Sequence, residues 1–161
     1  MRRALAAAAA CAVVAAGCSI QVGGTAATPR APSGTYLGGG VCWLVSDAEI
    51  AAIAGRDPIG GGGGFELGGW RNCTWTLYLD PVESVVIGLT SAQSYRDDRK
   101  LWGDTASAVR GLGDEAYWVD SMDTLNILVG AQALSVSMFG DRFGSAEARA
   151  IAEKALPRLS P

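Results

Sequence analysis

Apolar and polar residues alternate with a period of two in several segments of this chain, and that pattern is typical of half-buried β-strands. In the clearest segment, 73–80, Cys73, Trp75 and Leu77 point one way while the threonines between them point the other way. Similar patterns predict further strands at 84–91, 114–120, 124–130 and 132–139. Gly130-Ala131 is a glycine-first pair that predicts a tight hairpin between the last two strands.

A helical period replaces the alternation in three other segments. Residues 46–55 begin with Ser46 and place Glu49 three positions later, which is the pattern of a capping box, and Gly55 suits the C-terminal end. Residues 94–102 predict a short polar helix, and residues 145–159 predict an amphipathic one. Long β-α-β crossovers are scarce in this order. The pattern therefore predicts an α+β fold with an antiparallel sheet of about five strands and helices packed on one face.

The first 17 residues have the features of an export signal. Two arginines precede an apolar run at 4–16, which is too short to span about 30 Å of hydrocarbon as a helix. The run leads into "AAGC", which resembles the lipobox of bacterial lipoproteins, with Ala15 where that motif usually has leucine. The resemblance implies a signal peptide at 1–17 and a diacylated Cys18 as the new first residue. Ordinary secretion and an uncleaved anchor are the alternatives.

A segment without helical or strand periodicity separates Cys18 from the predicted strands. It is rich in Gly, Ala, Thr, Ser and Pro, so residues 18–40 are interpreted as a flexible tether and 41–161 as a single domain outside the cytoplasm. Removal of 1–17 leaves 11 basic against 16 acidic residues. This negative balance argues against a nucleic-acid partner, and the two acyl chains on Cys18 would supply the attachment to the outer face of the cell membrane.

Histidine is absent from the chain, which excludes Ser-His-Asp and Cys-His catalysis and any zinc site that uses histidine. No catalytic, cofactor-binding or metal-binding residues are predicted. After export, the two cysteines of the domain, Cys42 and Cys73, are expected to form one structural disulfide. The alternative is a redox pair, but thioredoxin-type pairs are spaced as CxxC and these two are 31 residues apart.

Several motifs taken together resemble a family of actinobacterial lipoproteins that share a domain of unknown function. They are "CWLVSDAEIAAIAG", "CTW", "VRGLGDEAYW" and the closing "AEARAIAEKALPRL", and they cover about 41–161. The matching positions are Cys42, Cys73, Trp75 and 111–116, while Trp43 stands where that family more often has a small acidic or polar residue. The resemblance implies an exported, lipid-anchored, disulfide-linked domain, and it carries no catalytic residues.

Two glycine-rich motifs invite a nucleotide-binding interpretation that their context does not support. "GLGDEA" at 111–116 matches a dinucleotide fingerprint, but it precedes a strand instead of opening a helix, so a tight turn is predicted. The five glycines at 60–64 lack the Lys-Ser/Thr ending of a phosphate loop and are interpreted as a flexible loop that could cover a cleft. The adjacent acids Asp97 and Asp98 are interpreted as part of a solvated helix face.

Trp70 and Trp102 are the candidate contacts for an apolar or glycan ligand, although packing in the core is the competing interpretation. These observations favour a lipid-anchored envelope lipoprotein that acts as a non-catalytic binding or interaction module, with an envelope protein or such a ligand as partner. One alternative is a carrier of a lipid or other apolar ligand, which requires an apolar cavity of several hundred Å³. The other is a hydrolase, which requires two carboxylates across a cleft.

Overall fold

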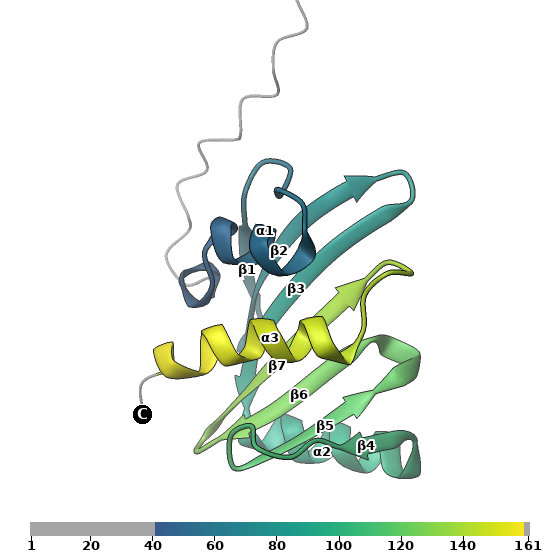
Figure 1. Ribbon diagram of the computed structural model, residues 1–161. Coiled ribbons are helices and arrows are strands. Elements are labelled where there is room, and N and C mark those ends of the chain that lie inside the picture. The colour runs from purple at the N-terminus through teal and green to yellow at the C-terminus, as the bar shows by residue number, and fades with distance from the viewer. Residues whose placement is uncertain (1–40, 160–161) are drawn as a thin grey trace, which may run out of the picture.

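Every strand in residues 41–159, the part of the chain that the computed structural model describes, joins one antiparallel sheet (Figure 1). The sheet order is β1-β2-β3-β7-β6-β5-β4. The strands are β1 (Gly63–Leu67), β2 (Trp70–Leu79), β3 (Val82–Ser91), β4 (Ala106–Ala108), β5 (Glu115–Val119), β6 (Thr124–Val129) and β7 (Gln132–Phe139). The helices are α1 (Asp47–Ala54), α2 (Ala92–Trp102) and α3 (Ser145–Ala155). The predicted signal peptide at 1–17, Cys18 and the tether lie outside the described residues.

The α+β class is confirmed, but the sheet has seven strands and not five. The two additional strands are β1 and β4, and they form its two edges. β1 begins at Gly63, inside the glycine run that was expected to be a loop, and pairs with β2 from Gly63–Thr74 to Leu67–Trp70. β4 has three residues and pairs with β5. Neither segment is long enough, or apolar enough on one face, to show a strand period.

The helices do not all cover one face of the sheet. In Figure 1, α1 and α3 lie in front of the sheet and α2 lies behind it. β5 shows the division: Ala116 and Trp118 join the core beneath α1 and α3, whereas Tyr117 and Val119 pack with Tyr95 of α2. The prediction that the helices pack on one face is therefore right for α1 and α3. It is wrong for α2, which packs on the opposite face.

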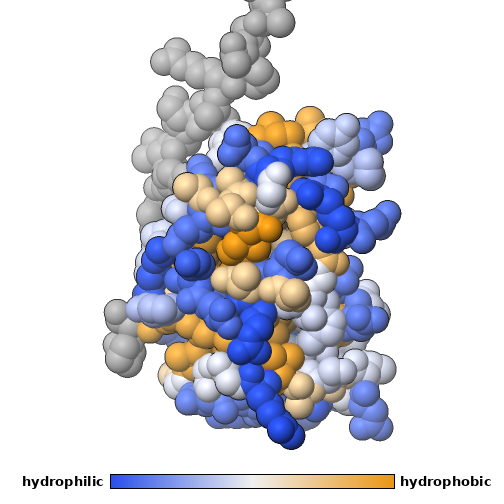
Figure 2. All heavy atoms as spheres, in the orientation of Figure 1, coloured by the Kyte–Doolittle hydropathy of each residue, from blue (hydrophilic) through white to orange (hydrophobic). Residues whose placement is uncertain are grey.

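The main core lies between the sheet and the pair α1 and α3. Alternate residues of the central strands supply it, including Ile87, Leu134 and Val136, and Ile151 of α3 packs against them with no exposed surface. Burial of each such side chain contributes about 1.5–3 kcal/mol. The outer surface of this side mixes hydrophilic and apolar side chains (Figure 2). The apolar side chains of the central strands on this face are therefore buried beneath α1 and α3 and form the core.

An ion pair ties the C-terminal end of the described chain to α1. Arg158 donates to both carboxylate oxygens of Glu49, at 2.7 and 2.8 Å. Glu49 also accepts the backbone N–H of Ser46, and Ser46 Oγ accepts the N–H of Glu49, which confirms the predicted capping box. The hydrogen bond from Arg158, followed by the one from Ser46, lowers the pKa of Glu49 to about 2. The carboxylate is thus charged and held at neutral pH.

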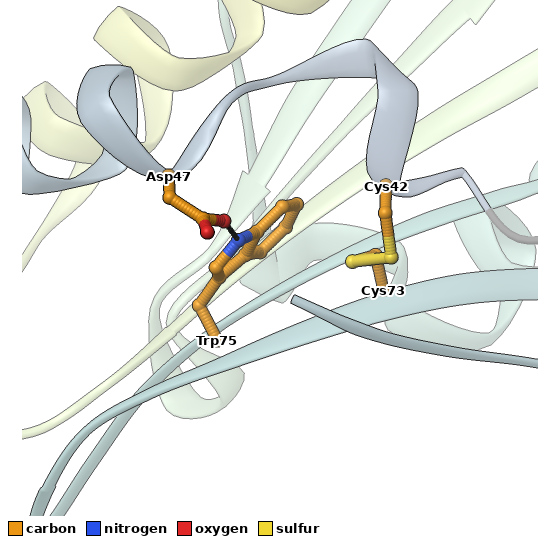
Figure 3. Close-up of a disulfide and its surroundings, with 4 residues drawn as sticks. All are labelled: Cys42, Asp47, Cys73 and Trp75. Atoms are coloured by element: carbon orange, nitrogen blue, oxygen red, sulfur yellow. Dashed lines mark hydrogen bonds between the residues drawn. A yellow bond between two sulfur atoms is a disulfide. The ribbon is translucent and has the colours of Figure 1, made fainter. Parts of the chain in front are cut away.

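The predicted disulfide between Cys42 and Cys73 is present (Figure 3), with 5.0 Å between the two Cα atoms. It links the turn before α1 to the middle of β2. Beside it, Trp75 is fully buried and donates from Nε1 to Asp47 Oδ1 at 2.7 Å. Gly62 packs against both groups: a Cβ there would lie 2.7 Å from Trp75 Nε1 and 2.8 Å from Cys73 Sγ. The glycine run therefore has a packing role next to the disulfide.

Candidate ligand-binding site

A pocket of about 340 Å³ lies between α2 and the sheet face that α2 only partly covers. It is on the side opposite α1 and α3, behind the view of Figure 1. Its lining comes from α2, from every strand of the sheet except the two edge strands, and from the turn between β5 and β6. The residues are Trp70, Thr90, Asp98, Leu101, Trp102, Val119, Met122, Thr124, Asn126, Ser135 and Ser137.

Small polar side chains form the floor of the pocket. Ser137 pairs with Thr124 and Ser135 pairs with Asn126 across β7 and β6, and paired residues in a sheet point to the same face. The hydroxyls of Thr124 and Ser137 are 2.8 Å apart and hydrogen-bonded. The alternation that sends Leu134 and Val136 into the main core sends these serines to the pocket side. The floor therefore offers hydroxyl and amide groups without charge.

Trp70 forms one wall, and its place depends on a glycine. On the pocket side of the sheet, a Cβ at Gly88 would lie 2.8 Å from Trp70 Nε1 and 2.6 Å from Ser135 Oγ. The indole thus lies directly over the backbone of β3, in space that any other residue at position 88 would fill. Trp70 still has 44% of its surface exposed. A large aromatic ring is therefore held beside the pocket with part of its surface free for contact.

The opposite wall comes from one face of α2. Asp98, Leu101 and Trp102 are spaced at i, i+3 and i+4, so their side chains lie next to one another on the helix surface. Leu101 is 77% exposed, which places it at the rim. Val119 at the end of β5 and Met122 in the turn after it continue the apolar lining. The walls are therefore mainly apolar and aromatic, in contrast to the polar floor.

A pair of tyrosines fixes α2 on the sheet. Tyr95 of α2 and Tyr117 of β5 are both buried, with ring centroids 5.1 Å apart. The guanidinium of Arg99 lies 5.3 Å from the centroid of the Tyr117 ring, and its Nη1 donates to the Gly103 carbonyl. Burial raises the pKa of Tyr117 to about 12, so its hydroxyl is neutral. These contacts hold the helix face that carries Asp98 and Trp102 in place.

The adjacent acids of α2 have different surroundings. Asp97 accepts hydrogen bonds from Gln93 at 2.9 Å and from Lys100 at 3.3 Å, and these bonds lower its pKa. Asp98 lines the pocket and has no hydrogen bond or ion pair within residues 41–159. Contact with the neighbouring protein, and then the nearby charge of Asp97, raise the pKa of Asp98. Both carboxylates are exposed, as the interpretation of a solvated helix face expects, and Asp98 in addition lines the pocket.

The structure brings the two predicted ligand contacts together, because Trp70 and Trp102 line the same pocket. Asp98 and the polar floor were not predicted as ligand contacts from the sequence. The spacing of Asp98 and Trp102 at i and i+4 was a signal that both share one helix face. The floor residues had a weaker signal, since serines and threonines that alternate with core residues are common on any exposed sheet face.

The remaining motifs have structural roles. Segment 111–116 is a turn that leads into β5 at Glu115, as predicted: Gly111 and Gly113 have positive φ, and Asp114 accepts the N–H of Gly130 at 2.7 Å. A Cβ at Gly113 would collide with the carbonyl of Leu128. In residues 41–159, no group of three or more Asp, Glu or Cys side chains is arranged to hold a metal ion.

Comparisons of the chain with known protein families, with curated proteins and with solved structures found no match. The resemblance to actinobacterial lipoproteins therefore stays a prediction. Within the described range, none of the helices has the length and apolar character needed to span a bilayer.

Proposed function

We propose that the protein is an exported, lipid-anchored envelope lipoprotein whose domain binds a small ligand without catalysis. The observation that carries the proposal is the pocket beneath α2, which Trp70 and Trp102 line together with a polar floor. Ligand sites combine apolar and aromatic walls with a few polar groups that fix orientation, and this lining has that composition. The acyl chains on Cys18 and the tether at 18–40 would hold the pocket outside the cell membrane.

The size of the pocket limits the ligand. Its volume of about 340 Å³ is at the lower end of the range of roughly 300–1,000 Å³ for small-molecule sites. A compact molecule or one headgroup fits this space, whereas a complete lipid with its acyl chains does not. The volume thus favours a receptor for a small ligand, or for the exposed part of a larger one, over a carrier that encloses a whole lipid.

The hydrolase alternative finds little support in the same pocket. Cleavage of a glycosidic bond by two carboxyl groups requires both of them to face the substrate. The lining contains one carboxylate, Asp98. Asp97 is the next residue but belongs to another side of the helix, where Gln93 and Lys100 hold it. The pocket therefore supports binding better than this chemistry.

Blocking the pocket tests the binding proposal. Asn126→Trp places a large side chain on the floor, whereas Ser107→Trp adds the same side chain to β4, outside the pocket. Full-length protein is extracted from membranes and analysed by native mass spectrometry for a bound small molecule. We expect the molecule in the wild type and in Ser107→Trp and at least a ten-fold lower occupancy in Asn126→Trp. A wild type without a ligand, or equal occupancy in both variants, contradicts the proposal.

The lipid anchor has a separate test. Intact-mass measurement of the membrane-extracted protein should show a chain that begins at Cys18 and carries acyl mass. Cys18→Ala should move most of the protein from the membrane to the soluble fraction, because the acyl chains would supply nearly all of its membrane affinity. Cys11→Ala is the matched control, since that cysteine lies in the predicted signal peptide and should change nothing. Equal membrane retention of the Cys18→Ala variant would reject lipidation.

A further inference from the structure

The geometry points to a pocket that selects ligands bearing a positive charge, of the substituted-ammonium class, over neutral and anionic ligands of the same shape. This inference rests on the proposed function, because it assumes that the pocket binds a ligand. Two observations carry it. The single charged residue of the lining is the carboxylate Asp98, and the two largest side chains of the lining are the indoles Trp70 and Trp102.

The charges around the pocket disfavour an anion. No arginine or lysine lines it. The basic residues next to Asp98 in the helix are engaged elsewhere: Arg99 lies over the Tyr117 ring and bonds to the Gly103 carbonyl, and Lys100 pairs with Asp97. An anionic ligand would meet the charge of Asp98 with no cation in the lining to offset it. A phosphate or carboxylate group would therefore find neutral hydroxyl and amide donors in the lining but no cation.

Asp98 itself lacks a counter-ion. It makes no hydrogen bond or ion pair with the residues of 41–159, while its neighbour Asp97 makes two hydrogen bonds. The Asp98 side chain is exposed, and contact with the neighbouring protein, followed by the charge of Asp97, raises the pKa of its carboxyl. A ligand cation in the pocket would supply the missing charge. Because Asp98 is exposed to solvent, dissolved salt screens this attraction, which is therefore largest at low ionic strength.

The aromatic walls add a second attraction for the same class of ligand. The face of an indole ring carries negative electrostatic potential, and tryptophan is the best of the aromatic side chains at binding cations. A substituted ammonium group also presents apolar methyl or methylene groups, which suit Leu101, Val119 and Met122. A bare metal ion is usually held by several charged ligands, whereas the lining offers one carboxylate and otherwise neutral hydroxyl and amide oxygens. The combination therefore fits an organic cation.

A matched series of probes tests charge selection directly. Choline, 3,3-dimethylbutan-1-ol and 3,3-dimethylbutanoate share a branched head and differ in charge. Each is titrated into full-length protein in a non-ionic detergent at low ionic strength, with calorimetry as readout. We expect choline to bind about ten-fold more tightly than the neutral alcohol, since it gains both the Asp98 and the indole attractions. The anion should bind more weakly than the alcohol.

Matched variants test the contribution of the Asp98 charge and that of the Trp70 indole separately. Asp98→Asn should weaken choline binding about five-fold or more and leave the alcohol unchanged, which also shows that the pocket is intact. Asp97→Asn removes the same charge from the adjacent residue outside the pocket and should have less than a two-fold effect. Trp70→Ala should weaken choline binding, and Trp43→Ala, which removes an exposed tryptophan elsewhere, should not.

The outcomes separate this inference from the proposed function. If the alcohol binds as tightly as choline, or if Asp97→Asn and Asp98→Asn have equal effects, charge selection is rejected while the pocket remains a binding site. Tighter binding of a neutral sugar, such as N-acetylglucosamine, would also reject it and favour a glycan. If no probe binds, and Asn126→Trp matches the wild type in the native mass measurement, both proposals fail.

Discussion

Loss of the Cys42–Cys73 disulfide is expected to lower the free energy of unfolding by about 3.5 kcal/mol. The bond closes a loop of 31 residues that contains α1, the glycine run and β1, and the chain-entropy model gives this magnitude for that loop length. Cys42→Ala combined with Cys73→Ala should therefore shift the urea midpoint strongly downward. Equilibrium unfolding by urea, followed by tryptophan fluorescence, measures the difference.

Reduced wild-type protein is the natural control for this double variant. Both lack the covalent link, so their unfolding midpoints should agree closely, whereas the oxidised wild type should stand apart from both. The loss of stability should affect β1 in particular. Gly62 packs against Cys73 Sγ, and β1 begins at the next residue, Gly63. A double variant within about 1 kcal/mol of the oxidised wild type would show that the bond contributes little to stability.

The elements that the sequence predicted well are those in which burial has a clear period. β2, β3, β6, β7, α1 and α3 each place apolar residues on one face at the expected spacing, and the main core collects those faces. β1 was missed because glycine has no side chain with which to show a period, and its pairing with β2 is a tertiary effect. β4 was missed because three residues are too few for any pattern.

The position of α2 on the sheet could not be predicted from the sequence, for a different reason. Its sequence is mostly polar, with Tyr95 as its large buried side chain, so the pattern identifies a helix but not the sheet face that it covers. That choice depends on Tyr117 and Ala133, which point away from the main core on β5 and β7. The pocket exists because α2 covers only part of that face. Its tryptophans were predictable as candidates, but the role of Asp98 required the packing of α2.

Trp75→Ala is expected to destabilise the domain by about 4 kcal/mol. Trp75 has no exposed surface and packs between the disulfide and the start of α1 (Figure 3), so its removal leaves a large cavity in a rigid part of the core. The hydrogen bond from Nε1 to Asp47 Oδ1 is a smaller contribution, since Asp47 is exposed and water can replace the lost donor. The cavity left by the missing indole, and not the lost hydrogen bond, should therefore account for most of the lost stability.

Three variants separate these contributions in urea unfolding. Trp75→Phe keeps most of the ring volume and loses the donor, so it should cost about 1–2 kcal/mol. Asp47→Ala leaves the buried indole N–H without its acceptor and should cost a similar amount. Trp43→Ala, at a tryptophan that is 58% exposed, should stay within about 0.5 kcal/mol of the wild type. If Trp75→Phe proved as destabilising as Trp75→Ala, the hydrogen bond to Asp47 and not the filled volume would be what holds α1 against the sheet.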